Sequence, residues 1–259
     1  MQGKFAEYLD FANYLADQAA LISQKYFRQQ IPVDSKAGNY PVTIADREIE
    51  LSLRELIKTN FPDHGIIGEE YANTDEEKPW CWVIDPIDGT VAFTAGKPVF
   101  TTLIALIFKG TPVLSIIDQS ITKERFLGVY GESAFLNGHK LKTSYKTDLD
   151  TARLNATTPY MFISDYEKAK FDVIRRKVKV TSFGGDAYAY GLLAAGHIDI
   201  IMEADLQYYD VAALIPIIEA SGGIITDWQG NTITRKFNGQ CLASANPILH
   251  KKVLEQINQ

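Results

Sequence analysis

Three observations in the amino-acid sequence predict an α+β protein built from two subdomains. Apolar residues recur at helical spacing through the first 60 residues, and short runs typical of buried strands continue to about residue 140. Beyond that point, strands and helices alternate. The chain has 259 residues, 46% of them hydrophobic, which is enough for two packed units with a sizeable core. We therefore expect subdomains at residues 1–145 and 146–259, with a cleft between them.

The first subdomain is expected to begin with two amphipathic helices. Their apolar spacing places one helix across residues 4–28 and the other across 43–59, separated by the loop PVDSKAGNYP. Buried strands are predicted for GIIG, WCWVI and ERFLGVYG, and for the two halves of TTLIALIFKGTPVLSIID, which turn at Lys109–Pro112.

The second subdomain is expected to alternate helices with strands. DAYAYGLLAAG predicts a helix that Gly196 ends, and HIDIIMEA predicts a strand. YDVAALIPIIEASGG predicts a helix that Pro216 kinks, and PILHKKVLEQI predicts a terminal helix.

Composition limits the function classes. A net charge of −6 argues against nucleic acid or an anionic membrane as the main partner. It does not exclude a small anionic substrate, because a bound cation can invert the local field. No apolar stretch approaches the length of a membrane span, and the acid-containing N-terminus is typical of neither a signal nor a transit peptide. The two cysteines favour a reduced, cytoplasmic compartment, with a single disulfide left open.

The stretch WVIDPIDGTVAFTAG brings two carboxylates to the end of a buried strand. The three-residue step can turn Asp85 and Asp88 to one side of a tight turn, with the Ile87 carbonyl outward. Gly89 permits close approach to a ligand, and Thr90 opens a short helical segment whose free N–H groups suit an anion. The plain alternative is a surface turn, for which Asp, Pro and Gly are all favoured. The buried strand leading into the turn favours a cation site.

Other acidic residues lie at comparable places. Glu69 and Glu70 follow GIIG, Asp46 lies in the first turn of the second helix, and Asp210 begins YDVAALIPIIEASGG. Each has a simpler explanation: a solvated turn, an acid favoured by the helix dipole, or an N-cap. Because the chain has no histidine or cysteine cluster, the acids together predict an all-oxygen site that suits Mg²⁺ or Mn²⁺ better than Zn²⁺.

These motifs resemble the inositol monophosphatase superfamily of Mg²⁺-dependent phosphatases. GEE, WVIDPIDGTVAF and YDVAALIPIIEASGG occur in the order and at about the separations of that family, and VTIADREIE resembles its N-terminal helix. The resemblance covers essentially the whole chain. It implies a layered α-β-α-β-α sandwich that is commonly a homodimer.

The resemblance also implies a metal centre of two or three Mg²⁺ ions, with Mn²⁺ as a possible substitute. The implied ligands are Glu69, Asp85, the carbonyl of Ile87, Asp88 and Asp210. A weaker third ion would involve Glu69 and the loop around Lys36. Two cations roughly 3.5–4 Å apart can activate water and neutralise the leaving oxygen in an in-line displacement.

Three residues are implied to be catalytic: Glu69, Thr90 and Asp46. Thr90 would pair with Asp46 to orient and deprotonate the metal-activated water. Asp88 and the backbone amides of Gly89 and Thr90 would hold the phosphate. Phosphoryl transfer depends on positioning and charge neutralisation, so no protein nucleophile is required.

The segment SFGGDAYAYGLLAAGHIDIIMEADLQYYD resembles the histidinol-phosphate phosphatase branch more than the inositol branch. The resemblance implies that Gly185, Asp186 and Glu203 bind the substrate. Two carboxylates suit the cationic histidinol group. Asp186 can instead be an N-cap, and Glu203 can lie in solvent or contact inositol hydroxyls. Four tyrosines can line the pocket or pack in the core: Tyr188, Tyr190, Tyr208 and Tyr209.

The sequence thus predicts a cytoplasmic Mg²⁺-dependent phosphomonoesterase that converts L-histidinol phosphate, an ester of histidine biosynthesis, to histidinol and phosphate. The alternatives are an inositol-1-phosphate or broad sugar-phosphate phosphatase, and a non-catalytic binding protein on the same fold. The expected partner is a small phosphate monoester, with no nucleic acid or membrane, and the chain is expected to form a homodimer.

Overall fold

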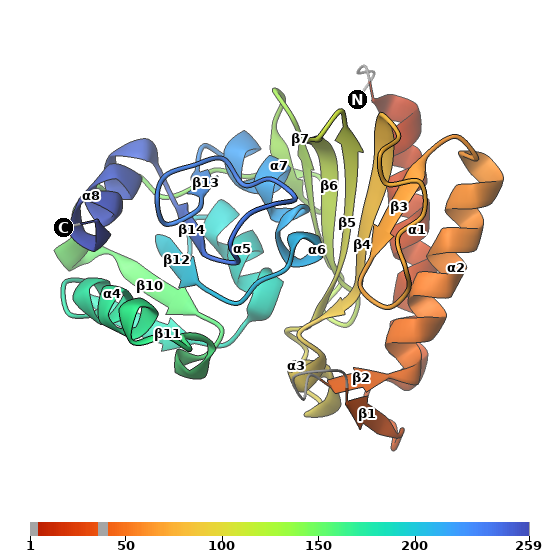
Figure 1. The fold of residues 1–259 in the computed structure, drawn as a ribbon, viewed down its shortest axis with the longest axis horizontal. Helices are drawn as coiled ribbons and strands as arrows, with labels where there is room; N and C mark the ends of the chain where they lie inside the picture. Colours follow the sequence, from red (N-terminus) through yellow and green to blue (C-terminus); the bar gives the residue numbers. More distant parts are fainter. Residues whose placement is uncertain (1–4, 36–40, 259) are drawn as a thin grey trace.

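The computed structural model describes residues 5–35 and 41–258, whose helices and strands form five layers (Figure 1). The α-helices of these residues are α1 (Ala6–Tyr26), α2 (Ile44–Asn60), α3 (Thr90–Thr94), α4 (Asp165–Arg175), α5 (Asp186–Ala194), α6 (Tyr208–Val211), α7 (Leu214–Ala220) and α8 (Pro247–Ile257). Two 3-10 turns, η1 (Leu149–Thr151) and η2 (Pro159–Met161), lie in connections. The bounds of α1 and α2 agree with the helices predicted from apolar spacing.

The first sheet has the strand order β3-β4-β5-β6-β7-β8-β9. Its strands are β3 (Gly65–Gly68), β4 (Trp80–Asp88), β5 (Thr101–Phe108), β6 (Thr111–Gln119), β7 (Glu124–Val129), β8 (Ala134–Leu136) and β9 (His139–Lys140). β3 runs parallel to β4, and every other neighbouring pair is antiparallel. Helices α1 and α2 cover one face, where Leu15, Ile49 and Leu53 share a core with Ile104 of the sheet.

The second sheet has the order β11-β10-β12-β14-β13. Its strands are β10 (Arg153–Ala156), β11 (Val180–Phe183), β12 (Ile200–Glu203), β13 (Ile224–Thr226) and β14 (Cys241–Ser244). β10 is parallel to both β11 and β12, whereas β14 is antiparallel to its neighbours. Phe171 of α4 and Val253 of α8 pack on the outer face of this sheet with Leu154 and Met202.

Helices α5, α6 and α7 form the middle layer between the two sheets (Figure 1). Leu193, Val211 and Ile217 from these helices share one core with Val83 of the first sheet and Ile201 of the second. The predicted α-β-α-β-α order of layers is thereby confirmed. The division into subdomains at residues 145 and 146 stays a prediction, because helices that follow it pack against the first sheet.

The segment after Gln207 differs from its prediction. A single helix kinked at Pro216 is expected from the sequence, but the structure has two helices, α6 and α7, separated at Ala212–Ala213. Pro216 is the third residue of α7 and has no N–H to donate to the carbonyl of Ala212. The missing hydrogen bond falls at the break, so proline separates the two helices instead of bending one.

The predicted loop PVDSKAGNYP contains a short antiparallel pair, β1 (Val33–Ser35) with β2 (Pro41–Thr43). Lys36, predicted near a third ion, lies outside the described residues. Cys81 and Cys241 are both buried free thiols, which answers the open disulfide question. Within residues 5–35 and 41–258, no helix combines the length and apolarity needed to cross a membrane.

Candidate functional site

A bulge at the end of β4 turns two aspartates to the same face of the first sheet. Asp85 pairs with Leu103 and Asp88 with Thr101, so three steps along β4 match two along β5. In a regular strand, residues three apart point to opposite faces. The extra residue reverses the alternation, and Asp88 rejoins Asp85 on the side of the middle helices. The hydroxyl of Thr102 donates to the Pro86 carbonyl at 2.8 Å and fixes the bulge.

Asp210 approaches this pair from α6. One carboxylate oxygen from each of Asp85, Asp88 and Asp210 lies within 4.8 Å of the others. Asp210 is not the N-cap suggested by its place in the sequence, because Gln207 holds that position. Asp210 is the third residue of α6, and its Oδ2 accepts the Gln207 N–H at 2.6 Å in a capping box. That bond aims the side chain back toward β4.

The arrangement of these three acids is consistent with a cation site. Burial and the neighbouring carboxylates raise the pKa values of Asp85 and Asp88, and burial raises the pKa of Asp210 to about 7. Asp85 Oδ1 is buried and accepts no hydrogen bond from the described residues. Oxygen donors, mutual repulsion and an unsatisfied buried oxygen together fit a hard divalent cation such as Mg²⁺.

The same cleft, of about 720 Å³, is also lined by Glu69 and Ile87. Burial of the Ile87 side chain in the α1–α2 core leaves the backbone of that residue to face the cleft. Of the two glutamates after β3, Glu69 lines the cleft and Glu70 does not. The other two predicted metal ligands, Glu69 and the Ile87 carbonyl, therefore lie beside the three aspartates.

Thr90 and Asp46 are in contact across α3 and α2. Thr90 Oγ1 lies 3.3 Å from Asp46 Oδ1 and 3.1 Å from the carbonyl oxygen of Ile87. Asp46 Oδ2 accepts the N–H of Thr43 at 2.8 Å and its hydroxyl at 2.6 Å. The second oxygen is thus fully engaged as a helix cap, which leaves Oδ1 to Thr90.

Asp88 joins the end of β4 to the start of α5. Its Oδ2 accepts the N–H of Ala187 at 2.6 Å. Gly89 has a φ of +80°, and a Cβ there would lie 2.9 Å from the Asp186 carboxylate, so glycine is required for two independent reasons. The close packing of Gly89 and Asp186 brings the expected phosphate-binding turn against the expected substrate-binding helix.

Asp186 and Glu203 line the opposite side of the cleft. Gly185 is the N-cap of α5, and Asp186 follows it with a φ of +45°, so the predicted N-cap alternative for Asp186 is wrong. Burial raises the pKa of Asp186 to about 6, which Lys97 partly offsets. Glu203 does not lie in solvent: it is 2% exposed and accepts the Thr157 N–H at 2.6 Å and the Tyr190 hydroxyl at 2.9 Å.

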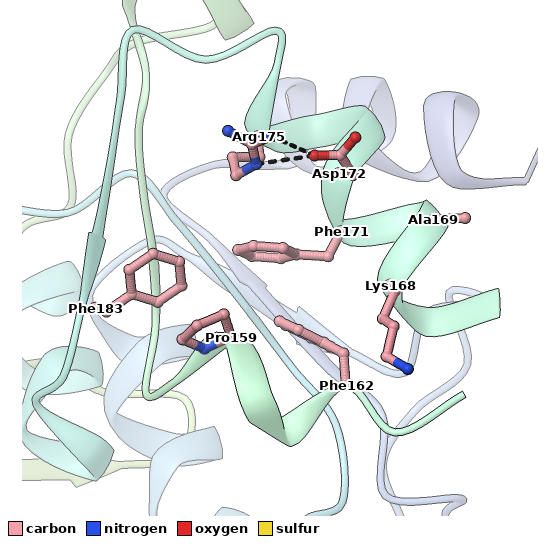
Figure 2. Close-up of a pocket in the computed structure, with 8 residues that line it drawn as sticks. All are labelled: Pro159, Phe162, Lys168, Ala169, Phe171, Asp172, Arg175 and Phe183. Atoms are coloured by element: carbon pink, nitrogen blue, oxygen red, sulfur yellow. Dashed lines mark hydrogen bonds and ion pairs between the residues drawn. The ribbon is translucent and has the colours of Figure 1, made fainter. Parts of the chain in front are cut away.

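A loop of residues 157–163, here called the rim loop, forms the mouth of the cleft with Tyr160, Met161 and Ile163. Phe162 anchors it from behind, stacking on Phe171 of α4 with ring centroids 4.3 Å apart. Figure 2 shows these two rings facing one another beside Pro159, in a hollow of about 580 Å³ that the charged residues Asp172 and Arg175 also line. The loop is therefore fixed by its buried side while Tyr160, 88% exposed, projects from it.

Of the four tyrosines, Tyr190 and Tyr209 line the cleft. Tyr188 donates instead to Glu124 at 2.8 Å, away from the cleft, and Tyr208 is buried in the middle layer. Sequence reasoning missed the Thr157 amide and a buried ion pair, Glu50–Arg54, beneath Glu69. For the ion pair, the available signal was the four-residue spacing from Asp46.

Fold and site together define a metal-dependent phosphomonoesterase, and comparison with known proteins agrees. The sequence model of the inositol monophosphatase family matches residues 5–259, and the chain belongs to that family. It is 42% identical to the bifunctional phosphatase IMPL2, chloroplastic, of Arabidopsis thaliana, over 95% of this chain and 73% of that protein. It is 31% identical to a histidinol-phosphatase of Chlorobaculum parvum, over 96% of both chains.

A solved structure gives the same answer for the fold. An inositol monophosphatase from Zymomonas mobilis superposes with a TM-score of 0.92 at 39% identity, covering 100% of both chains. The predicted enzyme class is confirmed. The relatives include both histidinol-phosphatases and inositol monophosphatases, so the family alone does not select one ester.

Proposed function

We propose that this enzyme hydrolyses a small phosphate monoester whose leaving group presents a cation or hydrogen-bond donors to Glu203 and Asp186. The observation that carries the proposal is Glu203, a buried carboxylate in the cleft held by two neutral donors. Within the described residues, Glu203 forms no ion pair, and no lysine, arginine or histidine lines the cleft. The leaving group of the substrate can supply the positive charge that the lining of the cleft lacks.

The metal centre is proposed from the same lining. Glu69, Asp85, the Ile87 carbonyl, Asp88 and Asp210 would hold two Mg²⁺ ions, with Mn²⁺ as a substitute. When bound, these ions supply a lowered pKa for the attacking water and neutralise the leaving oxygen. Any third ion would depend on the segment that contains Lys36.

The chain's own groups would orient the reactants. Thr90 Oγ1 is placed to accept a proton from water and pass it to Asp46 Oδ1, its neighbour at 3.3 Å. The amides of Gly89 and Thr90, next to Asp88, would hold the phosphate oxygens. Because Asp46 Oδ2 is engaged by Thr43, the proton can reach only one of the two carboxylate oxygens.

L-Histidinol phosphate is the substrate that the charges of the cleft favour. Seven acidic side chains line it: Glu69, Asp85, Asp88, Asp186, Glu203, Asp205 and Asp210. Even two divalent cations leave an excess of negative charge once a phosphate dianion is bound. An ammonium and an imidazolium opposite Asp186 and Glu203 would offset that excess.

The second candidate is an inositol-1-phosphate or broad sugar-phosphate phosphatase. Ring hydroxyls can also donate to Glu203, and the Zymomonas mobilis structure, at 39% identity, is named an inositol monophosphatase. The comparisons support this broader reading better than histidinol selectivity. The cytoplasmic location and the homodimer stay predictions, and the Arabidopsis relative is named chloroplastic.

The decisive experiment measures phosphate release in Mg²⁺ from L-histidinol phosphate and from myo-inositol 1-phosphate. We expect a kcat/KM ratio of about 100 in favour of the histidinol ester, or about 2.7 kcal/mol of transition-state discrimination. Asp186→Asn should reduce that ratio, whereas the control Glu124→Gln, far from the cleft, should preserve it. Equal or reversed rates in the wild type would establish the second candidate instead.

A further inference from the structure

We propose that a buried ion pair on α2, Glu50–Arg54, is the positioning device that holds Glu69 at the metal centre. The inference rests on the proposed function for the role of Glu69 as a metal ligand. The pair touches neither metal nor substrate in this proposal. It acts through the backbone on both sides of Glu69.

Helix α2 presents three charged side chains on one face. Asp46, Glu50 and Arg54 follow one another at four-residue steps, which is close to one helical turn. All three are buried, with exposed fractions of 0%, 0% and 6%. The first contacts Thr90, and the other two face the turn after β3. One helix face therefore supports both Thr90 and the turn that carries Glu69.

The Glu50 carboxylate binds the backbone that follows Glu69. Its Oε2 accepts the Glu70 N–H at 2.7 Å, and its Oε1 accepts the Tyr71 N–H at 3.2 Å. Arg54 Nε donates to Glu50 Oε1 at 2.7 Å, and Arg54 Nη2 donates to the Tyr71 carbonyl at 2.9 Å. Tyr71 is thus held through both its N–H and its carbonyl.

The residue before Glu69 is fixed by the same pair. A Cβ on Gly68 would lie 2.0 Å from Glu50 Oε1 and 2.6 Å from Arg54 Nη2, so the backbone at Gly68 rests directly on the two side chains. Glu69 is therefore enclosed between a close backbone contact on one side and two hydrogen bonds on the other. Its main chain has little freedom to move.

Such support matters because Glu69 lines a cleft with other carboxylates that repel it. Burial raises the pKa of Asp85, and the charge of Glu69 raises it further. Without a cation, repulsion favours movement of Glu69 away from Asp85. A rigid turn opposes that movement and keeps the ligand in place before the metal arrives. Residues that orient a metal ligand typically change metal affinity by about 10–100-fold when altered.

The test is Glu50→Gln in the full chain, with Glu48→Gln as the matched control. Glu48 lies on the same helix and is also paired, but with Lys25 and Tyr26 on the outer side. We expect Glu50→Gln to weaken Mn²⁺ binding, followed by electron paramagnetic resonance, by about 10–100-fold. The KM for the ester at saturating Mg²⁺ should be unchanged. Glu48→Gln should bind Mn²⁺ as the wild type does.

A second measurement follows the turn itself without metal. Hydrogen exchange of the Glu70 and Tyr71 amides in EDTA should become at least about tenfold faster in Glu50→Gln. If that variant does not fold, Arg54→Lys keeps the charge but loses the Nη2 donor to the Tyr71 carbonyl, and a smaller change in the same direction is expected. Wild-type exchange, or wild-type Mn²⁺ affinity despite faster exchange, would overturn the proposal.

The metal-ligand role of Glu69 and the positioning role of the Glu50–Arg54 pair can be tested separately. Glu69→Gln should weaken Mn²⁺ binding at least as much as Glu50→Gln does. If Glu69→Gln binds Mn²⁺ normally, the role of Glu69 in the proposed function is wrong. Faster exchange at Glu70 and Tyr71 in Glu50→Gln would then still show that the ion pair holds the turn, but positioning of a metal ligand would be refuted.

Discussion

The two walls of the cleft both carry buried acids, but the acids are satisfied in different ways. On the first wall, formed by the ends of β3 and β4 with α3, Asp85 keeps a buried oxygen without a donor among the described residues. On the second wall, formed by β12, α5 and the rim loop, Glu203 has a neutral donor on each oxygen.

This difference separates two tasks. Carboxylates that repel one another are costly without a cation, and one oxygen of Asp85 also lacks a donor, so we expect the first wall to hold metal and to carry the reaction. A carboxylate already satisfied by neutral donors can stay in place while esters come and go, so the second wall is suited to choosing a leaving group. Asp210 belongs to the first task although it comes from the second half of the chain.

The largest effect should follow from neutralising the first wall. Asp85→Asn should lower kcat/KM by about 10³-fold, roughly 4 kcal/mol, because a proposed metal ligand is lost. In EDTA the same variant should be more stable than the wild type, because a repelling buried charge is gone. Phosphate release and thermal unfolding measure the two effects.

Asp118→Asn is the matched control. Asp118 is also a buried acid of the first sheet, but it is paired with Arg125 at 2.6 Å. Its removal leaves a partly buried arginine without its closest partner and should lower stability while activity persists. If both variants lost stability in EDTA, the carboxylates of the first wall would not be destabilising the metal-free protein, and the cation site would be refuted.

The buried acid of the second wall should make the stability of the protein depend on pH. Burial raises the pKa of Glu203 from 4.5 to about 7, so folding favours its protonated form. The contribution of Glu203 to the free energy of unfolding is fully present below pH 4.5. It is lost as pH rises through 7, by roughly 3 kcal/mol. In EDTA, the stability of wild type relative to Glu203→Gln should therefore fall between pH 5 and pH 8.

The difference between two proteins is the required measurement. Burial lowers the pKa of His250 to about 4. This residue therefore lowers the stability of the fold as pH falls below 6.5, whereas Glu203 lowers it as pH rises. His250 is common to both proteins and cancels. A wild-type and Glu203→Gln difference that does not change with pH would show that folding does not raise the pKa of Glu203.

A smaller effect is expected within the first wall. Thr90→Ala removes the hydroxyl that contacts Asp46 and should lower kcat by about 10²-fold, or 2.7 kcal/mol, without changing Mn²⁺ affinity. Thr94→Ala, one turn further along α3 and exposed, should behave as the wild type. Equal losses in both variants would point to damage to α3 instead of a missing proton acceptor.

Much of this architecture could be predicted because it depends on local patterns. Apolar spacing gave the bounds of α1 and α2 within two residues at each end, and acids at a strand end and at a helix start gave Asp85, Asp88 and Asp210. Their proximity could not be derived from spacing, because it depends on a bulge in β4 and on a capping box in α6. Both are set by contacts with other elements.

The Glu50–Arg54 pair shows the main limit of sequence reasoning. Glutamate four residues before arginine is typical of a solvated helix face, where such a pair contributes only about 0.3–0.5 kcal/mol. Its burial results from the turn after β3 closing over it, through Gly68 and Tyr71. Likewise, the sequence around Glu203 is typical of an exposed acid at a strand end, but in the structure the rim loop places the Thr157 N–H against its carboxylate. In both places, contacts between residues far apart in the sequence determine the burial of the acid.

The smallest effect is expected on the second wall, where a single hydroxyl changes the choice of ester without changing the reaction. Tyr190→Phe removes the hydroxyl that donates to Glu203 but keeps a ring that is 1% exposed. Loss of one hydrogen bond to a carboxylate should cost about 1.4 kcal/mol, or a tenfold rise in KM for esters that bind Glu203, with kcat nearly unchanged.

Tyr188→Phe makes this result interpretable. It deletes the same atom two residues away on α5, where the hydroxyl donates to Glu124 outside the cleft. Phosphate release from L-histidinol phosphate, from myo-inositol 1-phosphate and from a phosphate ester with a plain alkyl leaving group would separate the outcomes. A KM rise confined to Tyr190→Phe and to the first two esters would assign selection to the second wall. An equal rise for the alkyl ester would mean that Tyr190 supports the cleft as a whole, and the division of tasks between the walls would fail.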